Sequence, residues 1–223
     1  MVLPQLLPYR VGGKVSRLAL AVLAFMPAMA EAQERGPSRG ASKWYASLGS
    51  GLAWGDYIVD DASNSTWDFD AGFALRGTLE REVATRVGVG LAFSYARLPL
   101  TYNSLGASSQ CAPCAADATV SSYGGVIRMG GGPGFHQVIE VFVGALRYGN
   151  FEQHEPRGAL APKANTDFAF GAGYGFGYSL ANDWQIVLVQ DATNSLHERS
   201  TLPQGGGRVA RHFTTRLGLR IGF

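Results

Sequence analysis

The sequence predicts an all-β protein, specifically an eight-stranded antiparallel up-and-down transmembrane β-barrel. Three observations lead to this fold class: eight segments with alternating apolar and small or polar residues, connections that alternate between short and long, and thirty glycines in 223 residues. Period-two alternation indicates strands, because successive strand side chains point to opposite faces. The glycine share is about twice the usual one and lacks the three-residue period of collagen.

The N-terminal segment has the pattern of a secretory signal peptide. Arg10, Lys14 and Arg17 precede the apolar run 18–30, and small residues follow it around Ala32. This run is too short for a spanning helix, which needs roughly 20 apolar residues. We therefore expect a signal peptide at 1–32, a flexible leader at 33–41 and a barrel domain at 42–223.

Charge excludes one class of partner. Removing the three basic residues and the single Glu of the signal from the 19 basic and 17 acidic residues leaves 16 of each. The exported chain is thus near neutral, so its composition gives no support to nucleic-acid binding.

The eight predicted strands follow in order along the barrel domain. Each places large apolar residues on one face and small or polar residues on the other. They are expected near residues 44–54, 69–80, 86–95, 123–129, 139–148, 168–178, 184–191 and 213–223. The sixth, "FAFGAGYGFGY", has the strictest alternation. Aromatic residues stand at the apolar strand ends, where the two edges of a membrane are expected: Trp44, Trp54, Phe69, Trp184 and Phe223.

The connections carry a second, independent signal. Short turns are expected after the second, fourth and sixth strands, near "REVAT", "GGGPGFH" and "AND". The other four links are long and polar: roughly 56–68, 97–118, 149–166 and 193–209. This alternation is typical of an up-and-down barrel whose two ends differ.

The second face of the strands consists mainly of glycine, alanine and serine with isolated charges. Such a face suits the narrow interior of an eight-stranded barrel, with lipid on the apolar outside, better than the solvent surface of a lipocalin-like barrel. The charged residues on this face are Arg76, Glu80, Arg86, Arg128, Glu140, Asp191, Arg216 and Arg220. They are expected to form a lumenal polar network that fills and rigidifies the barrel, with a narrow ion or solute path as the alternative.

The signal peptide, the eight strands, the alternating loops and the closing "FTTRLGLRIGF" resemble the small OmpA/OmpX-type outer-membrane barrels of Gram-negative bacteria. In that family the last strand is read by the barrel-assembly machinery, and Leu217, Leu219, Ile221 and Phe223 fit those places. This sequence has Ile221 where the family often has Tyr, and Thr215 departs from the apolar pattern. The resemblance implies an outer-membrane location in contact with lipid and lipopolysaccharide.

Two cysteines, Cys111 and Cys114, fall in the second long loop. In an exported protein a close pair favours a disulfide that staples the loop. Redox chemistry would require a helix N-terminus in a βαβ unit, and zinc would require two further ligands, with His154 as one candidate. Free thiols are the remaining alternative.

Catalytic chemistry finds little support in the sequence. The histidine–serine strand motif of the lipid A deacylases, which have similar size and architecture, is missing. His197 lies near Ser195 and Ser200 in a segment expected to be a loop, and His212 lies on a predicted lumenal face. We expect no catalytic residues, no cofactor and no metal.

The expected role is non-enzymatic: structural, or surface interaction with an extracellular ligand or host surface through four extracellular loops. A narrow channel for small or amphipathic solutes is the alternative, and a lipid-modifying hydrolase is a third. Candidate loop contacts, which equally suit a cap on the barrel rim, are Tyr57, Trp67, Tyr102 and Phe151.

Overall fold

The computed structural model describes residues 43–60, 64–104, 113–154, 164–181, 183–197 and 208–223. The predicted signal peptide and leader, up to residue 41, lie outside these residues and stay predictions. The described residues contain no helix long and apolar enough to cross a membrane. The strands are β1 (Trp44–Gly55), β2 (Ile58–Asp60), β3 (Ser65–Phe69), β4 (Gly72–Ala84), β5 (Val87–Ser104), β6 (Cys114–Gly130), β7 (Phe135–Gln153), β8 (Asn165–Ala181), β9 (Trp184–His197) and β10 (Arg208–Gly222).

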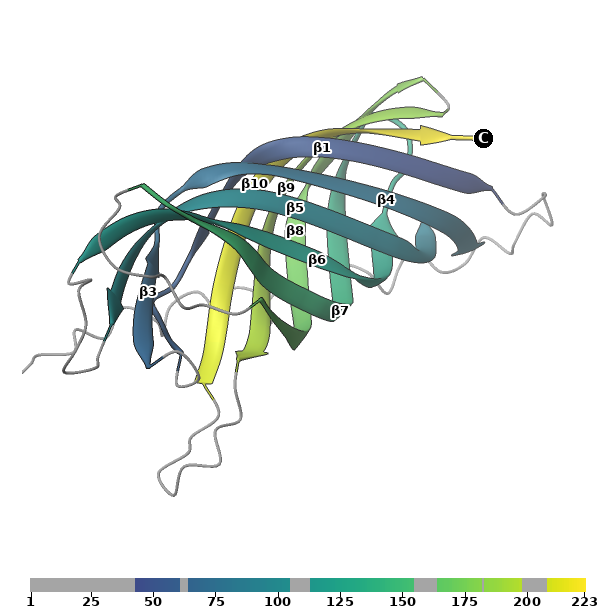
Figure 1. Cartoon of the computed structure of the whole chain (residues 1–223). Helices are drawn as coiled ribbons and strands as arrows, with labels where there is room; N and C mark the ends of the chain where they lie inside the picture. Colours follow the sequence, from purple (N-terminus) through teal and green to yellow (C-terminus); the bar gives the residue numbers. More distant parts are fainter. Residues whose placement is uncertain (1–42, 61–63, 105–112, 155–163, 182, 198–207) are drawn as a thin grey trace, which may run out of the picture. The chain divides into compact units, whose positions relative to one another are not determined.

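Eight of these strands close into an antiparallel barrel, which confirms the predicted fold class. The ring runs β1, β4, β5, β6, β7, β8, β9, β10 and back to β1, with each neighbour hydrogen-bonded to the next. The last strand pairs with the first, Leu219 opposite Leu48, and the two ribbons run side by side in Figure 1. Closure leaves no free edge among the eight barrel strands, whereas β2 pairs only with β3 among the described strands. Closure also pairs the backbone polar groups that lipid could not satisfy.

The strands are longer than predicted at the long-loop end. β5 and β6 remain paired as far as Tyr102 and Cys114, and β7 continues to Gln153. These extensions occupy much of what the sequence suggested were loops, because polar residues are compatible with a strand that has left the membrane. His197 likewise ends β9 rather than lying in a loop.

The first long link contains a short hairpin, β2–β3, with Ile58 opposite Trp67. β3 and β4 both pair with β5: β4 along the first part of β5, up to Arg97, and β3 along its last part, from Leu100. β3 and β4 therefore form one strand with an interruption. Phe69 lies opposite Leu100 and Phe73 opposite Arg97, so one extra residue stands on the β3–β4 side. This bulge turns Phe69 to the opposite face from Phe73, since a one-residue shift inverts which face a side chain occupies.

Glycines make room for larger side chains in the lumen. A Cβ on Gly173 would lie 2.2 Å from Oδ1 of Asp191, its neighbour on β9, and one on Gly175 would lie 1.9 Å from the Leu188 carbonyl oxygen. Neither position tolerates a side chain. The strict glycine alternation of the sixth predicted strand, here β8, therefore brings β8 and β9 close together and admits the charged side chain of β9.

Candidate functional site

The outer surface of the barrel is a continuous apolar belt. Leu91 is 69% exposed and Phe223 is 71% exposed. Every barrel strand contributes exposed apolar side chains, among them Leu48, Leu79, Leu91, Tyr123, Val143, Phe176, Leu188 and Leu217. Phe213 on β10 and Phe223 directly after it are ten positions apart. For a strand tilted near 45° this is about 24 Å along the barrel axis, which matches the apolar band of roughly 25 Å in such barrels. A surface of this kind is suited to lipid and not to water.

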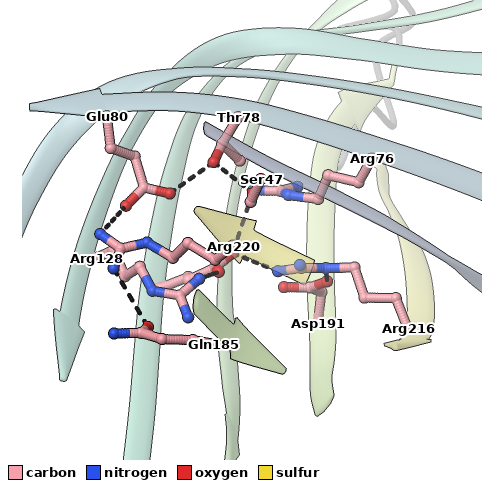
Figure 2. A network of polar contacts seen from close by, with 10 residues as sticks. Ser47, Arg76, Thr78, Glu80, Arg128, Gln185, Asp191, Arg216 and Arg220 are labelled. Carbon is pink, nitrogen blue, oxygen red and sulfur yellow. Dashed lines mark hydrogen bonds and ion pairs between the residues drawn. The ribbon is translucent and has the colours of Figure 1, made fainter. Parts of the chain in front are cut away.

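Glu140 on β7 is the centre of the charged side chains inside the barrel. Its carboxylate accepts a hydrogen bond from Arg128 Nη1 at 2.7 Å and another from Arg216 Nη2, and Arg76 Nη2 lies 3.6 Å away. Arg216 also donates from Nε to Asp191 at 2.8 Å. The labelled members of this group, from β4, β6, β9 and β10, converge in the lumen in Figure 2.

A second set lies nearer the short turns. Arg220 Nη2 donates to Glu80 Oε2 at 3.0 Å, and its Nη1 lies 3.3 Å from Gln185 Oε1. Thr78 donates to the other oxygen of Glu80 at 2.6 Å, so its own oxygen accepts from Ser47 at 2.7 Å. The Arg220 guanidinium also stacks on Tyr45, 3.5 Å from the ring centroid.

The structure brings together seven of the eight predicted lumenal residues and separates the eighth. Arg76, Glu80, Arg128, Glu140, Asp191, Arg216 and Arg220 are all buried. Arg86 is exposed in the β4–β5 turn, with φ of 64°, at the short-turn end of the barrel. Alternation alone placed it on the lumenal face of the third predicted strand, but β5 begins one residue later, at Val87, and leaves Arg86 in the turn.

An aromatic plug closes the other end of the lumen. Trp67, in the middle of β3, is fully buried, and its ring lies 5.7 Å from Tyr148, 5.1 Å from Phe151 and 5.5 Å from His197. Phe69 packs beside it at 6.3 Å. Because Tyr148 and His197 come from β7 and β9, Trp67 reaches across the barrel rather than lining one wall.

The plug corrects two expectations. Phe69 was predicted at the lipid-facing edge, yet it is 4% exposed, because the bulge after it turns it inward. Trp67 and Tyr102 were considered as loop contacts, yet both are buried, while Phe151 is half-buried and Tyr57 is exposed. Of the two roles considered for these residues, loop contact and capping of the barrel rim, the position of Trp67 fits capping.

His197, whose ring packs against that of Trp67, forms a buried cluster with two aspartates. Its Nδ1 lies 2.6 Å from Asp167 Oδ2 and its Nε2 lies 3.5 Å from Asp60 Oδ1. The cluster stands above the apolar belt, because the outward residues at this height include the exposed Arg147 and Arg211. Burial by itself would lower the pKa of His197, but the hydrogen bonds and charges of Asp167 and Asp60 outweigh it and raise the pKa to about 9.

This geometry argues against hydrolytic catalysis at the cluster. An imidazole with a pKa near 9 is protonated at neutral pH and cannot accept a proton from a nucleophile. Ser195 Oγ bonds the Tyr148 hydroxyl at 3.0 Å rather than His197, and the same hydroxyl bonds His212 Nε2 at 2.7 Å. The Tyr148 hydroxyl therefore ties together β7, β9 and β10 through Ser195 and His212.

The described residues contain no group of His, Cys, Asp and Glu able to hold a metal ion. His154 instead lies 3.1 Å from Asp117 Oδ2 on the outer surface. Cys114 begins β6 and is buried, whereas Cys111 lies outside the described residues. The predicted disulfide stays a prediction.

The residues of the predicted assembly signal lie on the outer face of β10. Leu217 and Phe223 are exposed, and Leu219 and Ile221 are half-buried against neighbouring side chains. Thr215, which breaks the apolar pattern, donates a hydrogen bond to Gln190 on β9. The polar step in the signal is thus paired on the outer surface. Recognition by the assembly machinery stays a prediction.

Comparison with known proteins confirms the fold. No protein-family model and no curated sequence matches the chain. Among solved structures, the crystal structure of neisserial surface protein A (NspA) aligns with a TM-score of 0.51 and 12% identity, over 81% of this chain and 97% of that one. The crystal structure of the outer membrane protein OprG from Pseudomonas aeruginosa aligns with a TM-score of 0.50 and 13% identity, over 82% and 96%.

These likenesses cover nearly the whole described barrel at low identity, so they concern architecture and not activity. They agree with the resemblance that the alternation, the loop lengths and the last strand predict. The chain has the fold of the small eight-stranded outer-membrane β-barrels.

Proposed function

We propose that this protein is a non-conducting, non-enzymatic outer-membrane barrel whose function is surface interaction at its long-loop end. The observation that carries the proposal is that buried side chains from several strands meet across the lumen at two levels, in the Trp67 plug and in the Glu140 ion network. A small space of about 40 Å³ separates them, enough for a water molecule or two and too small for a solute.

The exposed strand extensions offer a polar surface for such contact. Arg97 on β5 donates to Asp117 at 2.9 Å and to Glu152 at 2.7 Å, and His154 joins the same group. Tyr57, on the first link at the same end of the barrel, is 59% exposed. In the orientation of an outer-membrane barrel, the long-loop end faces the cell exterior. Binding residues are commonly displayed this way, at the end of a rigid scaffold.

Conductance across a planar lipid bilayer separates this proposal from a channel. The full chain, reconstituted from detergent, is expected to show no discrete current steps. Trp67→Ala is expected to remain silent as well, since the ion network still closes the lumen. Regular steps in the wild-type protein that grow in Trp67→Ala would establish the channel instead.

Surface interaction is tested by measuring how strongly cells that display the protein adhere to an abiotic or host surface. Cells carrying the wild-type chain are expected to adhere more than cells carrying a variant with 105–112 and 198–207 replaced by short Gly/Ser links. The matched control, Val83→Ser at the opposite end, is expected to adhere like wild type. Equal adhesion by all three at equal surface levels would refute this role.

A further inference from the structure

A cavity of about 520 Å³ lies at the short-turn end of the barrel, below the ion network. We call it the vestibule. Its walls are the β4–β5 turn with Arg86, the β6–β7 turn 130–134, and the lumenal side chains Tyr45, Gln185 and Arg220. Small-molecule sites typically have volumes of about 300–1,000 Å³. The vestibule is therefore large enough for a small ligand, and the Trp67 plug and the ion network separate it from the long-loop end.

The charges inside the barrel do not balance. Between the plug and the short turns, four buried guanidiniums face three buried carboxylates among the described residues. The cations are Arg76, Arg128, Arg216 and Arg220, and the anions are Glu80, Glu140 and Asp191. The exposed Arg86 and the half-buried Glu82, at the edge of the vestibule, add one charge of each sign. One positive charge is left over in a region largely shielded from water, where an uncompensated charge is costly.

Several guanidinium groups there also have unused donors. Arg220 is 5% exposed and lines the vestibule, and its Nε has no acceptor among the described residues. Arg128, 1% exposed above it, has no acceptor there for Nε and Nη2. Native proteins seldom leave such donors unpaired, which indicates an acceptor from outside the chain.

The vestibule wall presents further donors near these groups. The Oε1 atom of Gln185 faces Arg220, and its Nε2 amide lies 4.0 Å from where a Cβ on Gly131 would stand. Arg86 Nη2 lies 3.3 Å from the corresponding position on Gly132. The glycine turn thus lies between an amide donor and a guanidinium. Glu82, the carboxylate at this level, accepts from the Arg86 backbone N–H at 3.4 Å.

We infer that the vestibule binds a small oxyanion of the phosphate type, held by Arg86, Gln185 and Arg220. Guanidinium groups bind phosphate through paired N–H donors, and an amide NH₂ adds a neutral donor. A bound phosphate supplies the missing negative charge and acceptors for the unused donors. The group enters from the short-turn side, either as a soluble phosphate compound or as the headgroup of a lipid in the adjacent leaflet.

Isothermal titration of the full chain in a maltoside detergent with sodium phosphate tests this inference. Saturable binding is expected, weakened at least tenfold by Arg86→Gln and also by Thr85→Glu, which adds a carboxylate beside the vestibule. Arg81→Gln is the matched control, because Arg81 lies at the same end but on the outer face, over Trp44. It is expected to bind like wild type. Heat-modifiable gel migration verifies that each variant is folded.

The outcomes are distinct. No saturable binding by folded wild-type protein, or equal weakening by Arg81→Gln, overturns the inference. Where binding is seen, competition by short-chain phosphatidylglycerol but not by glycerol phosphate assigns the site to a lipid headgroup, and competition by both assigns it to soluble phosphate compounds. Neither arm depends on the adhesion or conductance results, so the proposed function and this site can fail separately.

Discussion

Glu140 is the single residue on which most lumenal charge compensation depends. Its carboxylate contacts three guanidiniums, those of Arg76, Arg128 and Arg216, and it is 1% exposed. Asp191 is the other carboxylate bonded to Arg216. Arg216 would therefore keep a carboxylate partner if the Glu140 charge were removed, whereas Arg76 and Arg128 would lose the ion pairs described above.

We therefore expect Glu140→Gln to lower the free energy of unfolding by about 3–5 kcal/mol, the usual cost of breaking a buried ion pair from one side. Urea unfolding of the detergent-folded barrel, followed by tryptophan fluorescence, measures it. The matched control is Glu152→Gln, whose ion pair with Arg97 is exposed. It should change stability by less than about 1 kcal/mol. Similar losses in both variants would contradict a special role for the buried network.

His197 gives stability a defined pH dependence. Its pKa is about 9 in the folded barrel and about 6.5 in an unfolded chain, so the protonated ring favours folding. The contribution, about 3 kcal/mol, is complete below pH 6.5 and declines as pH rises through 9. The urea midpoint should fall across this window in wild type and less so in His197→Gln. A midpoint that is equally steep in both proteins would show that His197 is not the titrating group.

Among the structural elements, the β2–β3 hairpin carries the largest fully buried side chain of the described residues, that of Trp67. It joins β1 and β4 through Asp56–Tyr57 and Asp70–Ala71, which lie outside the strands, and Trp67 secures it in the mouth of the barrel. The Trp67 ring is the main apolar anchor, while Asp60 adds the ion pair to His197.

Trp67→Ala should destabilise the protein by about 3–5 kcal/mol, because it removes a fully buried aromatic and leaves a cavity. Limited proteolysis of the folded variant should also cut within 56–71 faster than in wild type, while the barrel strands stay protected. Trp184→Ala, on the exposed belt, is the control and should not speed cleavage there. Unchanged cleavage in Trp67→Ala would mean that the hairpin is held by something else.

At the scale of the whole molecule, the apolar belt decides which medium surrounds the barrel. Leu91 lies on the outer face of β5 within the belt. Leu91→Arg should cost about 2–4 kcal/mol of stability in lipid bilayers, since a cation facing the hydrocarbon core is strongly disfavoured. Val83→Arg, at the short-turn end of β4, should cost about 1 kcal/mol or less. Unfolding in urea from phosphatidylcholine vesicles measures both. Equal, small effects would indicate that water contacts this surface.

Alternation and loop length were sufficient to predict the eight barrel strands, their order and the apolar outer surface, because both follow from local side-chain direction. Alternation and loop length were insufficient at the long-loop end of the barrel. Phe69 and Phe73 share a face in any unbroken strand, and only pairing with β5 reveals the extra residue between them. Polar strand extensions likewise resemble loops, since beyond the membrane neither face needs to be apolar.

For the candidate site, the sequence identified the lumenal charges but not their partners. Arg216 and Glu140 are 76 residues apart, and Arg220 and Glu80 are 140 apart, so barrel closure alone brings each pair into contact. The plug, the His197 cluster and the vestibule have the same origin, since each combines residues from strands across the barrel. By itself, the sequence determined which residues within the barrel strands face lipid and which face inward, and it failed at the strand ends, for Phe69 and Arg86. The tertiary structure decided which inward residues meet, because that depends on register and closure, which the local pattern does not encode.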